Sequence, residues 1–426
     1  MSQLETVQQQ YADLLIQIGV NLQPGQCLLI SAELGHAPFV RQLVAAAYQA
    51  GAKYVHVQWS DALVQRAHLR NVDAAHLTYF PAYEITRMQQ MVDEQWARLA
   101  LTGDEFPGAL DDVDPKLIRE QSTMRRRAMR FYSEAMMANR MQWCVAGVPT
   151  PAWAQKVFPS LSSQAALETM WQTIFQVCRI DQADPVEAWQ RHDQSLSQVA
   201  RYLNDHAVQA LHFVDAAPGR DGRARTDLTV GLTDRPVWLA ASSLRPDGVR
   251  FLPNMPTEEV FSTPHNQRTN GWIVTSKPNF PFDQRVEDAY FRFEGGELVD
   301  FSAAVGQEIL QQFFEIDGAR RLGEVALVDV RSPVNQAGVI FYDTLFDENA
   351  VCHIAFGDAY PGGVVDGDNL GEDELAAQGV NRADTHVDFM VGTDTMTVTG
   401  ITATGTEVPV MENGQFVAAV LATNVA

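Results

Sequence analysis

Cysteine is scarce in this chain of 426 residues, and basic side chains are outnumbered by acidic ones. The four cysteines are widely spaced and form no CxxC pair, being Cys27, Cys144, Cys178 and Cys352. This pattern favours reduced thiols in a cytoplasmic protein over a disulfide scaffold. With 31 basic and 53 acidic residues the formal net charge is −22, which disfavours nucleic-acid binding because phosphate contacts need a basic surface.

Long hydrophobic runs are also missing, since no stretch approaches the roughly 18 apolar residues of a membrane-spanning helix. The first five residues lack the basic and apolar regions of a signal peptide, so neither export nor a membrane partner is expected. Hydrophobic residues nevertheless make up 46% of the chain, which excludes a disordered protein. The length predicts two to three domains, each with a full core.

Several common catalytic motifs are absent as well. No histidine is followed directly by glutamate, so the helix-borne HExxH site of many zinc peptidases is excluded. The sequence contains no GxGxxG, no Walker-type loop and no GxSxG elbow.

The pattern of secondary-structure signals differs between the two halves of the chain. In the first part, strand-like residues 27–30, helically spaced residues 38–49 and strand-like residues 54–57 predict a βαβ unit with parallel strands. From residue 211 onward, short β-rich runs separated by turn signals predominate. We therefore predict an α/β protein, with an N-terminal α/β scaffold domain (1–210) and a C-terminal mixed α+β metal-binding domain (211–426). Further elements are expected as a helix at 4–18, a basic helix around 119–130, helices over 167–204, and strands at 143–148, 228–232, 237–239, 289–293 and 325–328.

The segment THVDFMVG at 385–392 carries the first candidate site. Strand alternation places Val387, Phe389 and Val391 on one face and His386 with Asp388 on the other. An imidazole and a carboxylate two residues apart are typical of a metal-ligand pair, although a plain surface pair has the same pattern.

Other candidates lie in the same half of the chain. His353 is followed by Tyr360 in a segment without a clear solvent-facing period, and Glu258 and Glu259 lie between apolar residues after two prolines. Glu324 is expected at the mouth of a strand. Together these residues suggest a mixed nitrogen and oxygen site suited to Zn²⁺, Co²⁺ or Mn²⁺. The other eight histidines are interpreted as structural: His36, His56, His68, His76, His192, His206, His212 and His265.

At these residues the chain resembles the thermophilic-type metallo-aminopeptidases, the family of aminopeptidase T, aminopeptidase S and PepS. The most specific blocks are NMPTEEVF at 254–261, LGEVALV at 322–328, FYDTLFDENA at 341–350 and THVDFMVG at 385–392. Their order and length extend the similarity over nearly the whole chain.

The resemblance implies a hydrolase that removes N-terminal residues from short peptides with two divalent ions per chain (Zn, Co, Mn or Mg). The implied metal ligands are Glu258, Glu324, Glu348, His353, His386 and Asp388, with Glu324 as the carboxylate that bridges both ions. Tyr360 matches a tyrosine close to the metals, where it would donate a hydrogen bond to the oxyanion or ligate a metal. Glu259 is a candidate general base or an orienting carboxylate. Family members are described as homodimers, so a homodimer is expected.

Two alternatives belong to other functional classes. His353, His386 and Asp388 alone form the two-histidine, one-carboxylate set of a mononuclear Fe(II) ring-cleaving dioxygenase. The surplus carboxylates Glu258 and Glu324 favour the dinuclear hydrolase. A binding protein that keeps the site without catalysis is the third possibility.

Overall fold

The computed structural model describes residues 3–219 and 222–422. Met1 and Ser2, which belong to the five residues that lack signal-peptide features, lie outside this range. The chain divides into two compact units. Unit 1 comprises Met1–Trp189 and Ser242–Pro256, and unit 2 comprises Gln190–Ala241 and Thr257–Ala426. Neither unit is continuous in the sequence. The domains predicted at 1–210 and 211–426 stay a prediction, because compactness does not show which segments fold alone.

Unit 1 contains a five-stranded parallel sheet in the order β2-β1-β3-β4-β9. Its strands are β1 (Cys27–Glu33), β2 (Tyr54–Ser60), β3 (Ala97–Thr102), β4 (Trp143–Gly147) and β9 (Asn254–Met255). The helix α2 (Ala37–Gln49) connects β1 to β2, which pair in parallel. The βαβ unit predicted from residues 27–57 is therefore confirmed.

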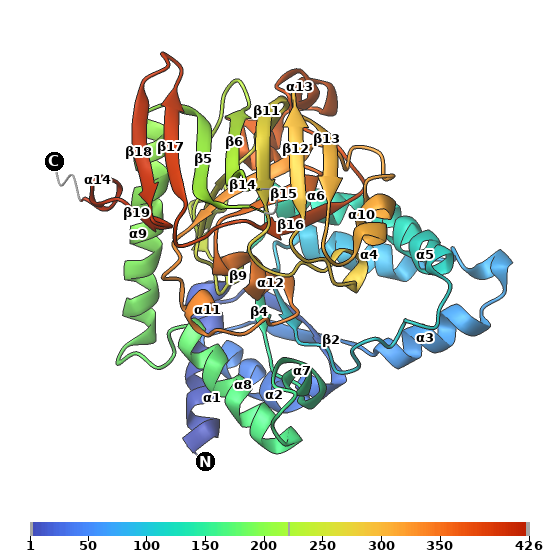
Figure 1. Cartoon of the computed structure of the whole chain (residues 1–426). Helices are drawn as coiled ribbons and strands as arrows, with labels where there is room; N and C mark the ends of the chain where they lie inside the picture. The colour runs from blue at the N-terminus through green and yellow to red at the C-terminus, as the bar shows by residue number, and fades with distance from the viewer. Residues whose placement is uncertain (1–2, 220–221, 423–426) are drawn as a thin grey trace. The chain divides into compact units, whose positions relative to one another are not determined.

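The helices of unit 1 follow the apolar periodicity of the sequence. In α2, Val40, Leu43 and Ala47 recur at helical spacing and are buried, because one stripe of the helix packs into the core. Figure 1 shows these helices in blue to green. They are α1 (Gln3–Leu14), α2, α3 (Ala62–Asn71), α4 (Ala82–Asp93), α5 (Pro115–Ala128), α6 (Arg130–Met137), α7 (Pro151–Val157) and α8 (Ser163–Val177).

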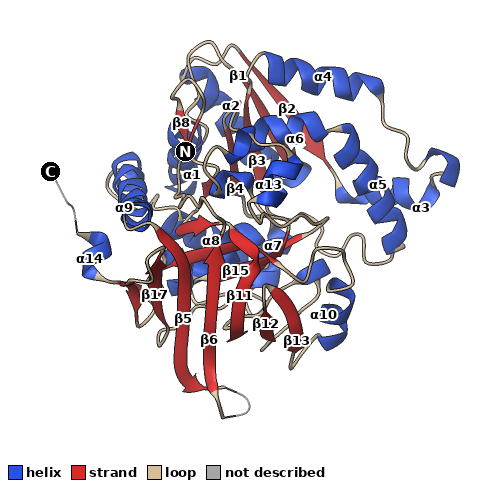
Figure 2. Cartoon of the chain, turned by 90° about the horizontal axis from the view of Figure 1, so that it is seen from above, coloured by secondary structure: helices blue, strands red, loops and turns tan. Residues whose placement is uncertain are grey.

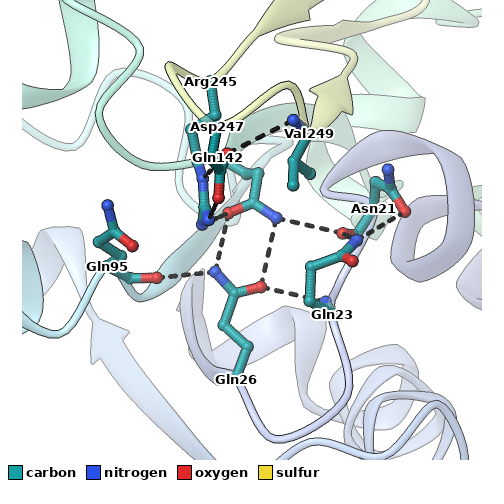
Figure 3. A network of polar contacts seen from close by, with 8 residues as sticks. All are labelled: Asn21, Gln23, Gln26, Gln95, Gln142, Arg245, Asp247 and Val249. Carbon is teal, nitrogen blue, oxygen red and sulfur yellow. Dashed lines mark hydrogen bonds and ion pairs between the residues drawn. The ribbon is translucent and has the colours of Figure 1, made fainter.

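A polar network around the buried Gln142 connects the late segment Ser242–Pro256 to the rest of unit 1 (Figure 3). This segment also contains the short strands β7 (Ser243–Leu244) and β8 (Arg250–Phe251). Arg245 donates to Gln142 Oε1 at 2.8 Å and to Asp247 Oδ1 at 2.9 Å. Gln26 Nε2 donates to the same Gln142 oxygen at 2.7 Å. Because Gln142 is fully buried, these bonds satisfy polar groups that would otherwise destabilise the core.

Unit 2 begins within α9 (Pro185–Asp205) and contains a long antiparallel sheet, whose strands lie side by side in Figure 2. Its eight strands have the order β13-β12-β11-β6-β5-β17-β18-β19. They are β5 (Val208–Pro218), β6 (Ala224–Leu232), β11 (Pro264–Val274), β12 (Tyr290–Glu294), β13 (Glu297–Ser302), β17 (Thr397–Thr402), β18 (Glu407–Glu412) and β19 (Gln415–Phe416).

A second antiparallel sheet of unit 2 has four strands in the order β10-β14-β15-β16. These are β10 (Glu259–Ser262), β14 (Leu322–Val328), β15 (His353–Gly357) and β16 (His386–Met390). Short helices accompany the two sheets: α10 (Gln307–Phe313), α11 (Pro333–Gln336), α12 (Thr344–Asp347), α13 (Glu372–Ala377) and α14 (Ala418–Leu421). A parallel sheet in unit 1 and antiparallel sheets in unit 2 confirm the predicted fold class.

An aromatic core packs against one face of the four-stranded sheet. Phe356 of β15 and Phe389 of β16 lie with ring centroids 5.5 Å apart. Phe291 of β12 contacts both rings, at 4.9 and 5.1 Å, so the core links the two sheets of unit 2. All three rings are fully buried.

Two local expectations differ from the structure. Residues 237–239 form no strand and make only an isolated bridge from Leu239 to Phe261, in place of a continuous ladder. Glu324 lies inside β14 and not at its mouth, because pairing with β15 extends two residues further toward the N-terminus. Within the part of the chain that is described, no helix is both long enough and apolar enough to cross a membrane.

Replacing Phe356 with alanine is expected to destabilise unit 2 by about 3–5 kcal/mol, because it removes a fully buried ring and leaves a cavity. Denaturant unfolding monitored by tryptophan fluorescence measures this change. The control is Val299→Ala on β13, where the side chain is 41% exposed. Equal effects of the two substitutions would contradict the assignment of the aromatic core.

Candidate metal centre

One face of the four-stranded sheet carries a group of acidic and imidazole side chains. Directly opposite residues of an antiparallel sheet point to the same face, as do residues two apart in a strand. Glu324, Ala355 and Asp388 are opposite one another across β14, β15 and β16. His353 lies two residues before Ala355, and His386 two before Asp388. Glu324, His353, His386 and Asp388 therefore share a face, opposite to that of Phe356 and Phe389.

Glu259 joins the same face through β10. Phe261 pairs with Ala326 of β14, and Ala326 pairs with His353 of β15. Because Glu259 precedes Phe261 by two residues, its side chain points to the face that carries His353.

The side chains on this face approach one another closely. His353 Nε2 lies 3.2 Å from Glu259 Oε2, 3.5 Å from Glu324 Oε1 and 3.9 Å from Asp388 Oδ1. His386 Nε2 lies 3.6 Å from Asp388 Oδ1 and 3.7 Å from Glu324 Oε2. Ligand atoms of Glu259, Glu324 and His353 all lie within 4.8 Å of one another, and all three residues are buried.

Backbone carbonyls fix the orientation of both imidazoles. His386 Nδ1 lies 2.7 Å from the carbonyl oxygen of Asp358, and His353 Nδ1 lies 3.4 Å from that of Val351. A carbonyl only accepts hydrogen bonds, so each Nδ1 carries the proton and Nε2 faces the carboxylates. This arrangement leaves both Nε2 atoms as the possible metal ligands.

Two glycines allow the backbone to close around the site. Gly323 lies at the irregularity in the β14–β15 pairing, and a Cβ atom there would meet the Asp358 carbonyl oxygen at 2.3 Å. Gly357 has a φ of +109°, and a Cβ atom there would lie 2.0 Å from the Thr385 carbonyl oxygen. Only glycine fits at these positions next to Glu324 and His386.

Glu348 approaches from a 3-10 turn (Glu348–Ala350) outside the sheet. Burial raises the pKa of its carboxyl well above the ordinary value, and the charges of Asp388 and Glu259 add to this effect. The next residue, Asn349, is fully buried and donates from Nδ2 to the Leu345 carbonyl oxygen at 2.9 Å. Glu348 therefore interacts electrostatically with the carboxylates that lie on the sheet, Asp388 and Glu259.

Glu258 is buried but is not among the three residues whose ligand atoms gather within 4.8 Å. Its Oε2 atom lies 3.5 Å from His192 Nε2 of α9. The structure therefore brings Glu259 to His353 and Glu324, whereas Glu258 lies beside His192. The ligand role of Glu258 and the base role of Glu259 stay predictions.

Tyr360 lies over His386, with ring centroids 4.9 Å apart. Its residue surface is 37% exposed, although the hydroxyl end is buried. Burial of the hydroxyl and the charges of Glu324 and Asp388 raise its pKa well above the ordinary value. The hydroxyl is therefore protonated and available as a hydrogen-bond donor.

The carboxylates and imidazoles on this face of the sheet shift one another's pKa values. Burial raises the pKa of Glu324, and the negative charges of Glu259 and Asp388 raise it further. Burial alone would lower the pKa of His386, but the charges of Asp388 and Glu324 raise it to about 10. Without a cation, protons on the imidazoles therefore neutralise part of the carboxylate charge.

The residues fit a divalent cation. Glu259 Oε2 is buried and accepts no hydrogen bond of good geometry, although His353 Nε2 lies nearby. Across residues 3–219 and 222–422, the ion pairs of Glu259, Glu324 and Asp388 are with the two histidines and not with lysine or arginine. Buried carboxylates and neutral imidazoles are ligands of Zn²⁺, Co²⁺ and Mn²⁺, so a cation would replace the protons and offset the charge.

A buried group of carboxylates and imidazoles on one face of a sheet is typical of a metal-dependent enzyme. Residues 4–416 match the family model for thermophilic metalloprotease (M29), and the chain belongs to this family. It is therefore a metallopeptidase, as the sequence blocks predicted.

Individual relatives agree with the family model. Aminopeptidase 2 of Geobacillus stearothermophilus is 40% identical over 418 residues, covering 98% of this chain and 99% of the relative. Aminopeptidase T of Thermus aquaticus is 40% identical over 407 residues, covering 95% and 97%. The solved structure of wild-type AmpT from Thermus thermophilus superposes with a TM-score of 0.88 at 35% identity, covering 97% of this chain and 100% of that one. The alternative of a ring-cleaving dioxygenase finds no support among these peptidases.

Two neighbours of the site were not anticipated from the sequence. The sequence pattern predicts a structural role for His192 and gives Asn349 no role. Both contact the segment that carries Glu258. No local signal marks them, because each acts across a sequence separation of 65 or 91 residues.

A divalent metal ion is expected to raise the unfolding temperature, because it binds the folded carboxylate group and relieves its repulsion. Saturation at about 100 times the dissociation constant adds about 2.7 kcal/mol. Thermal unfolding of chelator-treated protein with added Zn²⁺, Co²⁺, Mn²⁺ or Mg²⁺ measures the shift. Glu324→Ala is expected to abolish the shift, and Glu407→Gln, at an exposed position on β18, to retain it. A shift of wild-type size in Glu324→Ala would contradict the site.

Proposed function

We propose that this protein is an aminopeptidase that removes N-terminal residues from short peptides, using two divalent ions held in unit 2. The observation that carries the proposal is the buried group of Glu259, Glu324 and His353 in a chain of the metalloprotease family. The names of the relatives as aminopeptidases support the exopeptidase activity. We also propose Zn, Co, Mn or Mg as the metal, a cytoplasmic location and a homodimer, as the family resemblance implies.

The proposed ligands lie on the face of the four-stranded sheet that carries His353 and His386, and on the neighbouring 3-10 turn that carries Glu348. They are Glu324, Glu348, His353, His386 and Asp388, completed by one carboxylate of the Glu258–Glu259 pair. Glu324 has one oxygen near each histidine, at 3.5 Å from His353 Nε2 and 3.7 Å from His386 Nε2. This position between the two imidazoles supports Glu324 as the bridging carboxylate.

The bound ions would lower the pKa of a water and polarise the scissile carbonyl. In hydrolysis, the water oxygen bonds to the carbonyl carbon, the C–N bond breaks, and a proton passes to the leaving amine. The carboxylate of the Glu258–Glu259 pair that does not ligate would take the proton from the water and deliver it to the leaving amine. Tyr360 keeps its proton and would donate a hydrogen bond to the developing oxyanion. The surplus negative charge favours the cationic α-amine of the substrate.

Hydrolysis of aminoacyl p-nitroanilides tests the activity. Leucyl and arginyl p-nitroanilides are expected to release nitroaniline after reconstitution with a divalent metal. N-acetylated leucyl p-nitroanilide should stay intact, because the free α-amine is blocked. A chelator is expected to abolish release, and returning Zn²⁺, Co²⁺, Mn²⁺ or Mg²⁺ to restore it. Metal-independent release, or none with any metal, would contradict the proposal.

Metal analysis tests the number of ions in the proposed centre. Two Zn or Co ions per chain are expected, whereas a single ion per chain at saturation would contradict the dinuclear centre.

The paired substitutions Glu258→Gln and Glu259→Gln separate ligand from base, since each keeps the shape and removes the charge. The sheet register places Glu259 beside His353, so we expect Glu259→Gln to lose metal. Glu258→Gln is then expected to keep metal and lose turnover, with kcat falling more than KM rises. Metal content by elemental analysis and steady-state kinetics measure the two effects. If Glu258→Gln instead loses metal and Glu259→Gln keeps it, Glu258 is the ligand and Glu259 the candidate base, as the family resemblance implies.

A further inference from the structure

Both polar atoms of the peptide group between Thr257 and Glu258 form hydrogen bonds with side chains of unit 2 that are far away in the sequence. Its carbonyl oxygen accepts a hydrogen bond from His192 Nε2 at 2.8 Å. Its N–H donates to Asn349 Oδ1 at 2.7 Å. Both polar atoms of one peptide plane are thus fixed, immediately before the two adjacent glutamates of the site.

His192 provides the donor at the carbonyl end. It lies on α9 with 12% of its side chain exposed. Since a carbonyl oxygen cannot donate, His192 Nε2 carries a proton. The same nitrogen lies 3.5 Å from Glu258 Oε2, so the imidazole is also close to the carboxylate of the residue that it positions.

Asn349 provides the acceptor at the N–H end. Its Oδ1 atom must face Glu258, because the backbone N–H only donates, and its Nδ2 then donates to the Leu345 carbonyl oxygen. Nδ2 also lies 3.5 Å from Glu348 Oε1, and the Asn349 carbonyl oxygen accepts from Ser332 Oγ at 2.7 Å. Asn349 therefore connects the peptide before Glu258 to the turn that carries Glu348.

A peptide plane held at both ends cannot rotate, so the directions in which the next side chains leave the backbone are set. Glu258 follows this plane directly, and Glu259 begins β10 one residue later. A rotated plane would move the carboxylates relative to Glu348 and His353, whose positions are set by other elements. Metal affinity depends on such placement, because ligands must converge within a few tenths of an ångström.

We propose that His192 and Asn349 are positioning residues that clamp the Thr257–Glu258 peptide and thereby set the geometry of the metal centre. The inference rests on the proposed function, because it takes the acidic group to be a metal site. Neither residue is proposed to ligate the metal or to touch the substrate. Their effect is expected in metal affinity more than in the stability of the metal-free fold.

Substitutions at His192 test the clamp. His192→Phe keeps the ring and removes the donor, and His192→Asn keeps an amide that is too short to reach the carbonyl. His192→Gln places an amide N–H near the position of Nε2 and serves as the conservative rescue. His206→Phe is the matched control, because His206 is exposed immediately after the same helix and its Nδ1 bonds to the Tyr202 carbonyl oxygen. Asn349→Leu removes the acceptor at the other end.

Two measurements on the full chain are needed: the Zn²⁺ dissociation constant by competition with a chromogenic chelator, and the unfolding midpoint of the metal-free protein. We expect His192→Phe, His192→Asn and Asn349→Leu to weaken Zn²⁺ binding by about 10–100-fold. His192→Gln and His206→Phe should bind Zn²⁺ like the wild type. Under saturating metal, His192→Gln should also retain the wild-type KM and kcat.

Several outcomes would overturn the clamp. Wild-type Zn²⁺ affinity in His192→Phe would do so, as would equal losses in His192→Gln and His192→Phe. If His192→Phe does not fold, the comparison of His192→Asn with His192→Gln decides the same question. A wild-type chain that binds no Zn²⁺, Co²⁺, Mn²⁺ or Mg²⁺ would instead overturn the proposed function. Lower metal-free stability with unchanged Zn²⁺ affinity would assign His192 a structural role only.

Discussion

Mutual repulsion of buried carboxylates is the constraint on which the structure of unit 2 depends. Glu259, Glu324 and Asp388 lie on one face of a sheet, with Glu348 beside them, and burial makes their charges costly. Two imidazoles lie between them, and backbone carbonyls hold the histidine rings in place. The aromatic core on the opposite face holds the strands that carry these side chains. A rigid sheet can keep like charges together in a way that a flexible loop cannot.

Part of this arrangement follows directly from sequence pattern. Alternation in residues 385–392 placed His386 and Asp388 on one face and Phe389 on the other, as β16 shows. The parallel strands of unit 1 followed from the apolar run at 27–30, the helical spacing at 38–49 and the second run at 54–57. These predictions succeeded because strand and helix periods are local properties of the chain.

Other features depend on pairing between distant segments. Which of two adjacent glutamates faces His353 depends on the register of β10 against β14, and no local pattern encodes that register. The position of Glu324 within β14 likewise depends on its pairing with β15 around the irregularity at Gly323. The contact of His192 with the site cannot be predicted from its helical surroundings, because its partner, the Thr257 carbonyl, lies 65 residues further along the chain. Tertiary contacts of this kind determine a site without leaving a motif.

The interrupted course of unit 1 has a consequence for the order in which the protein is made. Its sheet is completed by β9, which pairs with β4. The hydrogen bond from Arg245 to the buried Gln142 also comes from the late segment Ser242–Pro256. During synthesis from the N-terminus, residues 190–241 of unit 2 leave the ribosome before that segment does. Until the beginning of unit 2 has been made, one edge of β4 therefore lacks its partner strand and Gln142 lacks its hydrogen bond from Arg245.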